Sequence, residues 1–97
     1  MEKALEEYVQ AIRRRPEVLQ VVLFGSFATG RYAPGSDVDL LLVLAASPKP
    51  FHERIPDYLP ERFPVGVDVF PYTAEEIDRN PFAQQAVREG RVLWQAG

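Results

Sequence analysis

Two aspartates and a Gly-Ser pair stand on either side of a short loop in this sequence. Gly25-Ser26 closes one apolar run, and Asp37 and Asp39 open the next one, which ends at Leu44. Both runs are short and rich in β-branched residues or leucine, which indicates buried strands rather than helices. The pattern GS-x10-DxD therefore places these side chains at one end of a sheet, where strand ends and loops carry function.

This combination of residue types predicts phosphate and metal chemistry. Asp37 and Asp39 share one face of a strand, roughly 6–7 Å apart, and two such carboxylates repel each other unless a cation lies between them. Gly25 lets a ligand approach the backbone closely because it has no Cβ. We interpret Ser26 as the N-cap of a short helix, whose free N–H groups favour a phosphate. A phosphate cradle facing a carboxylate pair predicts a nucleoside triphosphate site.

Each residue also has a plain structural interpretation. Asp37 follows Pro34-Gly35-Ser36, so by itself it could be an ordinary turn aspartate. Gly25 alone could mark only a turn. Asp39 is harder to explain in this way, because it precedes LLLVL inside a strand, where a charge is rarely buried without a partner or a metal.

A third aspartate interrupts a later β-branched run, VGVDVF at 65–70. Asp68 shares a face with Gly66 and Phe70, and the valines lie on the other face. If this strand lies beside that of Asp39, Asp68 completes a three-carboxylate cluster, with Gly66 leaving space next to it. On an edge strand it would instead be a solvent-facing aspartate.

The composition is that of an ordinary globular protein. With 97 residues, 46% of them hydrophobic and 26% charged, we expect one domain over residues 1–97. No run is long enough to span a membrane and no signal peptide is evident, and cysteine is absent, so we expect a cytoplasmic protein without disulfides. The net charge of −3 disfavours a nucleic-acid partner.

Periodicity and capping residues predict the remaining elements. A short or kinked helix is expected within 45–64, because Pro56 and Pro60 interrupt its apolar face, and a turn is expected at Pro34-Gly35. Thr73 to Glu76 is a capping box, and Asn80-Pro81 is an N-cap followed by an N1 proline. The other expected helices cover residues 2–15, 26–29, 73–79 and 80–90, and the expected strands cover 20–24, 38–44, 65–70 and 91–94.

Through Gly25, Ser26, Asp37, Asp39 and Asp68 the chain resembles the DNA polymerase β-type nucleotidyltransferases, and its length resembles their minimal nucleotidyltransferase (MNT) branch. The resemblance covers most of the chain. It implies an α+β (two-layer α/β) palm-like fold, a mixed sheet of three to four strands flanked by helices. It also implies two Mg²⁺ ions and transfer of a nucleoside monophosphate from an NTP, for which we expect ATP.

The resemblance also suggests a role for each residue. Asp37 and Asp39 would bind both metals, Asp68 would hold the acceptor-side metal, and Gly25 and Ser26 would hold the β- and γ-phosphates. Two features depart from the family. The residue four positions after the glycine, often arginine in relatives, is Thr29, with Arg31 two residues later, and the helix within 45–64 is shorter than in relatives.

Larger relatives append a helical domain that grips the acceptor, and 97 residues leave no room for one. We therefore expect either an acceptor on a separate protein or a homo-oligomer that completes the site. The MNT resemblance implies an all-helical HEPN toxin as partner, modified on a hydroxyl and thereby neutralised by this chain as antitoxin. A non-catalytic antitoxin that acts by contact is the second hypothesis, and a transferase acting on a small molecule is the third. The intact GS and DxD motifs favour the first.

Overall fold

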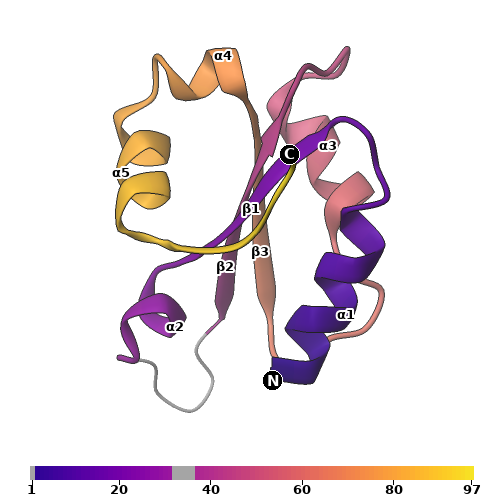
Figure 1. The fold of residues 1–97 in the computed structure, drawn as a ribbon, viewed down its shortest axis with the longest axis vertical. Helices are drawn as coiled ribbons and strands as arrows, with labels where there is room; N and C mark the ends of the chain where they lie inside the picture. Colours follow the sequence, from indigo (N-terminus) through magenta and orange to yellow (C-terminus); the bar gives the residue numbers. More distant parts are fainter. Residues whose placement is uncertain (1, 32–36) are drawn as a thin grey trace.

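The structure, a computed structural model, describes residues 2–31 and 37–97, which form a four-stranded sheet flanked by helices (Figure 1). No helix within these two ranges is long and apolar enough to cross a bilayer. The elements in chain order are α1 (Glu2–Ile12), β1 (Val18–Phe24), α2 (Ser26–Thr29), β2 (Val38–Leu44), α3 (Phe51–Tyr58), β3 (Val67–Thr73), α4 (Ala74–Ile77), α5 (Pro81–Glu89) and β4 (Arg91–Gln95).

The strands lie in the order β3-β2-β1-β4, and the sheet is mixed. β1 pairs antiparallel with β2 and with β4, whereas β2 and β3 are parallel. β2 is therefore central, as its apolar sequence predicts, and Leu40, Leu41 and Leu42 in it are completely buried. The expected α+β class and mixed sheet are confirmed.

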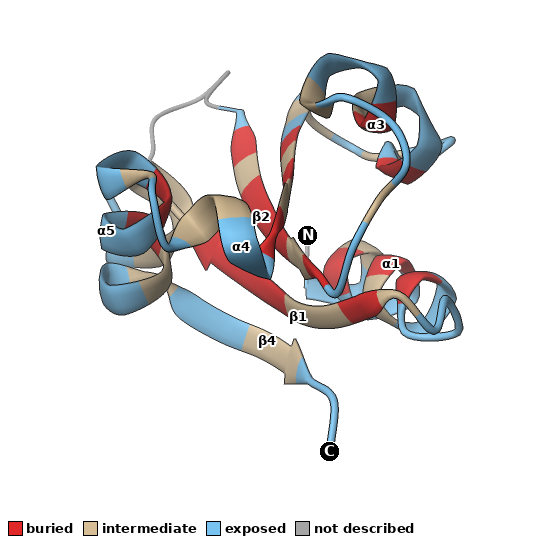
Figure 2. Cartoon of the chain, turned by 90° about the horizontal axis from the view of Figure 1, so that it is seen from above, coloured by how far each residue is buried: buried red, intermediate tan, exposed pale blue. Residues whose placement is uncertain are grey.

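Helices cover both faces of the sheet, with α1 and α3 on one side and α5 on the other (Figure 2). Leu40 and Leu42 of β2 pack in the core that contains α1, and Leu41 packs against Ala83 and Ala86 of α5. The helices that flank the sheet are divided between its two faces because a strand that is apolar on both faces must be covered twice.

Several boundaries differ from the predicted ones for identifiable reasons. α1 ends at Ile12 rather than at residue 15, since the residue before Pro16 is disfavoured in helical conformation. β3 covers Val67–Thr73 rather than 65–70 and so continues through Pro71. β3 is an edge strand of this sheet, where the missing proline N–H breaks no ladder bond.

The helix caps predicted at Thr73 and Asn80 agree with the structure. Thr73 Oγ1 accepts from the Glu76 N–H and the Glu76 carboxylate accepts from the Thr73 N–H, which confirms the capping box. Asn80 Oδ1 accepts from the Ala83 N–H at 3.0 Å and caps α5 as predicted. The short helix expected within 45–64 is α3, which includes Pro56. The turn expected at Pro34-Gly35 lies outside the described residues.

Candidate active site

The parallel pairing of β2 and β3 brings two of the predicted acids together. In its register Asp39 lies directly beside Asp68, and Asp37 precedes Asp39 by two residues at the same edge of the sheet. Asp39 is partly buried, and Asp37 and Asp68 are exposed. The strands of Asp39 and Asp68 are therefore neighbours, as the predicted cluster required. The roles of the three acids stay predictions.

The three carboxylates influence one another electrostatically. Burial raises the pKa of Asp39 above its ordinary value, and the negative charges of Asp68 and Asp37 raise that pKa further. Within residues 2–31 and 37–97, no three acidic, histidine or cysteine side chains are already grouped as a metal-binding cage. A positive charge between these carboxylates would favour their ionised forms and draw them together.

Gly25 brings the backbone at the end of β1 into contact with Asp39. Its φ of 75° and ψ of −152° lie in a region that residues with a side chain rarely adopt. An ideal Cβ on Gly25 would lie 2.5 Å from Asp39 Oδ2, closer than real Cβ atoms come to such an atom. The backbone of the Gly-Ser motif therefore touches the second carboxylate of the Asp-x-Asp motif, and only glycine permits this contact.

Gly66 likewise leaves room for a carboxylate, that of Asp37. A Cβ there would overlap Asp37 Oδ1. The expectation that Gly66 leaves space next to Asp68 is thus corrected in its detail: the carboxylate lying against Gly66 is that of Asp37, because the start of β2 runs alongside residue 66, whose carbonyl accepts from the Val38 N–H at 2.8 Å.

The interpretation of Ser26 as an N-cap is wrong. The cap position is Gly25, no side chain caps α2, and Ser26 is the first helical residue. Thr29, which stands where relatives often have arginine, donates its hydroxyl to the carbonyls of Gly25 and Ser26 at 3.4 and 3.2 Å. Thr29 therefore closes the turn, and Arg31, which follows it, is exposed.

Sequence reasoning missed three phenylalanines beside the acids. Phe24 is the β1 partner of Asp39, Phe70 follows Asp68 on the same face of β3, and Phe82 is the second residue of α5. Their rings touch pairwise, with centroids 5.3 to 5.7 Å apart. Their positions in the sequence could have drawn attention to them. Phe24 precedes Gly25-Ser26, Phe70 lies two residues after Asp68, and Phe82 follows the Asn80-Pro81 cap.

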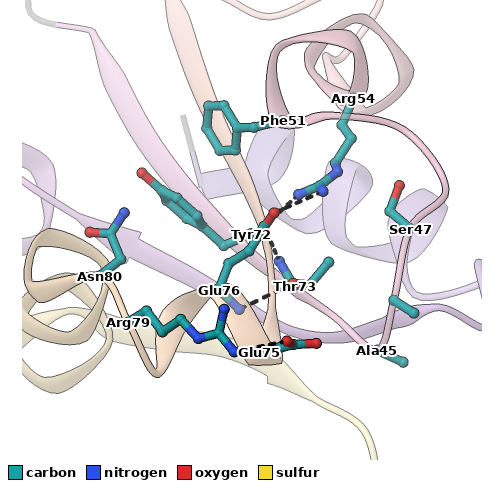
Figure 3. A pocket seen from close by; sticks show the side chains of 11 residues that line it. Ala45, Ser47, Phe51, Arg54, Tyr72, Thr73, Glu75, Glu76, Arg79 and Asn80 are labelled. Atoms are coloured by element: carbon teal, nitrogen blue, oxygen red, sulfur yellow. Dashed lines mark hydrogen bonds and ion pairs between the residues drawn. The ribbon is translucent and has the colours of Figure 1, made fainter.

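A pocket of about 610 Å³ lies at the opposite ends of β2 and β3, and none of the predicted site residues lines it (Figure 3). Arg54 of α3 is only 4% exposed there. Its guanidinium donates to the Pro71 carbonyl at 2.9 Å and to both Glu76 carboxylate oxygens at 2.6 and 3.0 Å. These bonds satisfy Arg54 internally, so its evident role is to join α3 to β3 and α4.

Comparisons with known proteins identify the family. A family model described as a nucleotidyltransferase domain matches residues 5–93. The chain belongs to this family. A protein of Methanocaldococcus jannaschii, provisionally named a protein adenylyltransferase, is 43% identical over 44 residues, which are 43% of this chain and 44% of that protein. The chain thus matches less than half the length of this relative.

Two solved structures share the fold of this nucleotidyltransferase domain. One, from Sulfolobus solfataricus and provisionally described as a nucleotidyltransferase, has a TM-score of 0.67 at 23% identity, covering 96% of this chain and 78% of its own. The other, a toxin–antitoxin structure with AMP-PNP, has a TM-score of 0.66 at 21% identity, covering 98% and 73%. The resemblance to polymerase β-type nucleotidyltransferases is confirmed.

Proposed function

We propose that this chain, acting as a single nucleotidyltransferase domain in the cytoplasm, transfers a nucleoside monophosphate from an NTP, ATP by preference, to a hydroxyl group on a partner protein. Membership of the nucleotidyltransferase domain family supports the reaction class. The observation that carries the proposal is the contact of Gly25 with Asp39, with Asp68 beside them. It joins the residues proposed for the phosphates to those proposed for the metal.

The donor set at this edge suits Mg²⁺. Carboxylate oxygens are the ligands that this hard cation prefers, and a cation would offset the burial and the neighbouring negative charges that raise the pKa of Asp39. Asp37 and Asp39 would hold two ions and Asp68 the one on the acceptor side. Bound there, the ions would neutralise phosphate charge and lower the pKa of the acceptor hydroxyl.

In the proposed reaction, the acceptor oxygen attacks the α-phosphorus in line with the departing pyrophosphate. A bond forms between this oxygen and the α-phosphorus, and the bond from the α-phosphorus to the bridging oxygen breaks. The hydroxyl proton passes to the exposed Asp68 carboxylate and from there to water. The β- and γ-phosphates are assigned to the backbone of Gly25 and Ser26, at the end of β1 beside the Asp39 carboxylate.

The partner we propose is a HEPN-type helical protein that the transfer neutralises. Two likenesses support a protein acceptor: the Methanocaldococcus relative is named for protein adenylylation, and one structural neighbour is a toxin–antitoxin assembly with AMP-PNP. The neutralisation of a toxin by contact alone is the competing hypothesis. The glycine–carboxylate contact favours catalysis, because a surface that acts by contact has no need of neighbouring acids held against a position that only glycine can occupy.

The test is intact-mass analysis of a candidate HEPN-type partner protein, after incubation with wild type, Mg²⁺ and each NTP in turn. We expect a mass gain of one or more nucleotidyl units. Asp39→Asn should reduce the transfer by more than about 100-fold, since even partners of metal ligands contribute 10- to 100-fold. Unchanged transfer by folded Asp39→Asn would contradict the metal assignment, and a stable complex without any mass gain would favour the contact hypothesis.

A further inference from the structure

Three phenyl rings form a cluster between the acids and α5. Phe24 and Phe70 lie 5.3 Å apart, and Phe82 lies 5.7 Å from Phe24 and 5.6 Å from Phe70, measured between ring centroids. Phe24 and Phe70 are partly buried, but Phe82 is 48% exposed. Phe82 is thus a half-exposed aromatic residue that lies against Phe24 and Phe70, and these two neighbour Asp39 and Asp68 in the sheet.

The exposed ring borders a pocket. A cavity of about 390 Å³ lies between α2 and α5, and Phe24, Gly25, Ala28, Phe82 and Ala86 form its mostly apolar wall. Gly25 belongs both to this wall and to the contact with Asp39. A molecule whose phosphates lie at Gly25 and Asp39 would therefore have its remainder beside this pocket.

The rim of the pocket is polar. Gln85 and Glu89 lie one turn apart on α5, both exposed, and Gln85 Nε2 donates to Glu89 Oε2 at 2.8 Å. This bond leaves two side-chain acceptors unused: the amide oxygen of Gln85 (Oε1) and the second carboxylate oxygen of Glu89 (Oε1). An apolar pocket with a few polar groups at its rim is typical of sites that bind small planar ligands.

We propose that this pocket takes the nucleobase of the NTP, which stacks on Phe82. The proposal rests on the proposed function, because it requires the triphosphate to lie at Gly25 and Asp39. The pocket of about 390 Å³ is large enough for a base, the exposed Phe82 ring that lines it is the kind of side chain on which bases stack, and the rim acceptors suit an exocyclic amino group. The pocket would thus let this domain bind the base of the NTP with its own residues.

The test compares ATP with inorganic tripolyphosphate, which lacks a base, by calorimetric titration in Ca²⁺ so that no turnover occurs. Wild type should bind ATP more tightly than tripolyphosphate. Phe82→Ala should weaken ATP binding about 5- to 150-fold, as loss of a stacked aromatic does, and leave tripolyphosphate binding unchanged. Phe82→Leu, which keeps the apolar packing but not the ring, should behave in the same way. Phe51→Ala is the matched control, because Phe51 contacts Tyr72 near the other end of the sheet.

The outcomes separate this inference from the function on which it rests. Two results would overturn this inference and leave the proposed function standing. In the first, wild type binds ATP no more tightly than tripolyphosphate. In the second, folded Phe82→Ala binds ATP as tightly as wild type does. Normal ATP binding by Phe82→Ala with reduced transfer to the partner would assign the ring to the acceptor and would likewise overturn it. If wild type binds neither ligand, the proposed function fails and this inference fails with it.

Discussion

At the scale of single residues, the site depends on a glycine that could not be any other residue. Gly25 combines a positive φ with a contact to the Asp39 carboxylate that a Cβ would prevent. Gly30, at the other end of α2, has the same φ of 75° but nothing within 4 Å of where its Cβ would be. The two glycines thus share a positive φ but not a conformation: Gly30, with ψ of 11°, is left-handed helical, whereas Gly25, with ψ of −152°, lies in a region almost exclusive to glycine. Only Gly25 has a steric requirement as well.

This difference predicts distinct outcomes for the two alanine variants. Gly30→Ala should lower the free energy of unfolding by about 1–2 kcal/mol, because a left-handed backbone disfavours any Cβ. Gly25→Ala should lower it by more, because the Gly25 conformation is less accessible to other residues and its Cβ would meet Asp39. Only Gly25→Ala should also abolish nucleotidyl transfer, because its Cβ displaces Asp39. Thermal unfolding and the mass assay together measure both effects. Equal loss of activity in the two variants would show that backbone strain, and not the Asp39 contact, is what matters.

At the scale of elements, one ion pair joins α3 to the junction of β3 and α4. The carboxylate of Glu76 both completes the capping box of α4 and accepts two bonds from the buried Arg54. The hydrogen bonds from Arg54 are the main reason why the pKa of Glu76 falls from its ordinary 4.5 to about 2. Removal of this charge would leave an arginine buried without its counter-ion.

The depressed pKa predicts a pH dependence of stability. In the folded state Glu76 binds its proton only near pH 2, whereas in the unfolded state it does so near its ordinary pKa of 4.5. Stability from this pair is therefore present above about pH 5 and is lost as the pH falls toward 2. We expect about 1–2 kcal/mol, a discounted figure because the Glu76 side chain is 40% exposed. Urea unfolding at several pH values measures it.

Glu76→Gln and Glu75→Gln make a matched pair for this measurement. Glu75 forms only an exposed pair with Arg79, at 3.2 Å, so its replacement should alter stability little at any pH. Glu76→Gln should be less stable than wild type at pH 7 and should approach wild type near pH 2. A constant difference across this range would mean that the Glu76 charge contributes nothing.

At the scale of the whole molecule, the proposed ion site would link folding to ion binding. The aspartates come from two strands that are parallel neighbours only in the folded sheet, so an ion held by them binds the folded state preferentially. Burial raises the pKa of Asp39, and the neighbouring charges of Asp68 and Asp37 raise that pKa further, so a cation beside Asp39 would relieve an unfavourable charge. Ion binding should therefore stabilise the fold and not merely assist the reaction.

Magnesium should raise the melting temperature of wild type. At ten times its Kd, a ligand that binds only the folded state adds about 1.4 kcal/mol, which corresponds to roughly 5–10 °C for a domain of this size. Asp39→Asn should melt higher than wild type without Mg²⁺, because a repelling charge is gone, and should gain little when Mg²⁺ is added. Differential scanning calorimetry with Mg²⁺ and, as a salt control, with Na⁺ measures both shifts. An equal Mg²⁺ gain in the two proteins would place the ion elsewhere.

The sequence by itself determined the local features of this protein. Strand β2, the capping box at Thr73 and the cap at Asn80 were predictable because neighbouring residues fix them through periodicity and backbone hydrogen bonds. The GS-x10-DxD spacing indicated the chemistry because its residues are close along the chain, although Ser26 proved not to be the cap.

Only the tertiary structure decided what residues distant in the chain do together. The parallel pairing of β2 with β3 sets Asp68 beside Asp39, the pairwise contacts of Phe24, Phe70 and Phe82 assemble over three elements, and Arg54 meets Glu76 22 residues away. A local sequence pattern indicates which face of a strand or helix is apolar, but it does not indicate which other strand or helix packs against that face. Strand order, register and the burial of the whole core settle that choice, and with it the geometry of the site.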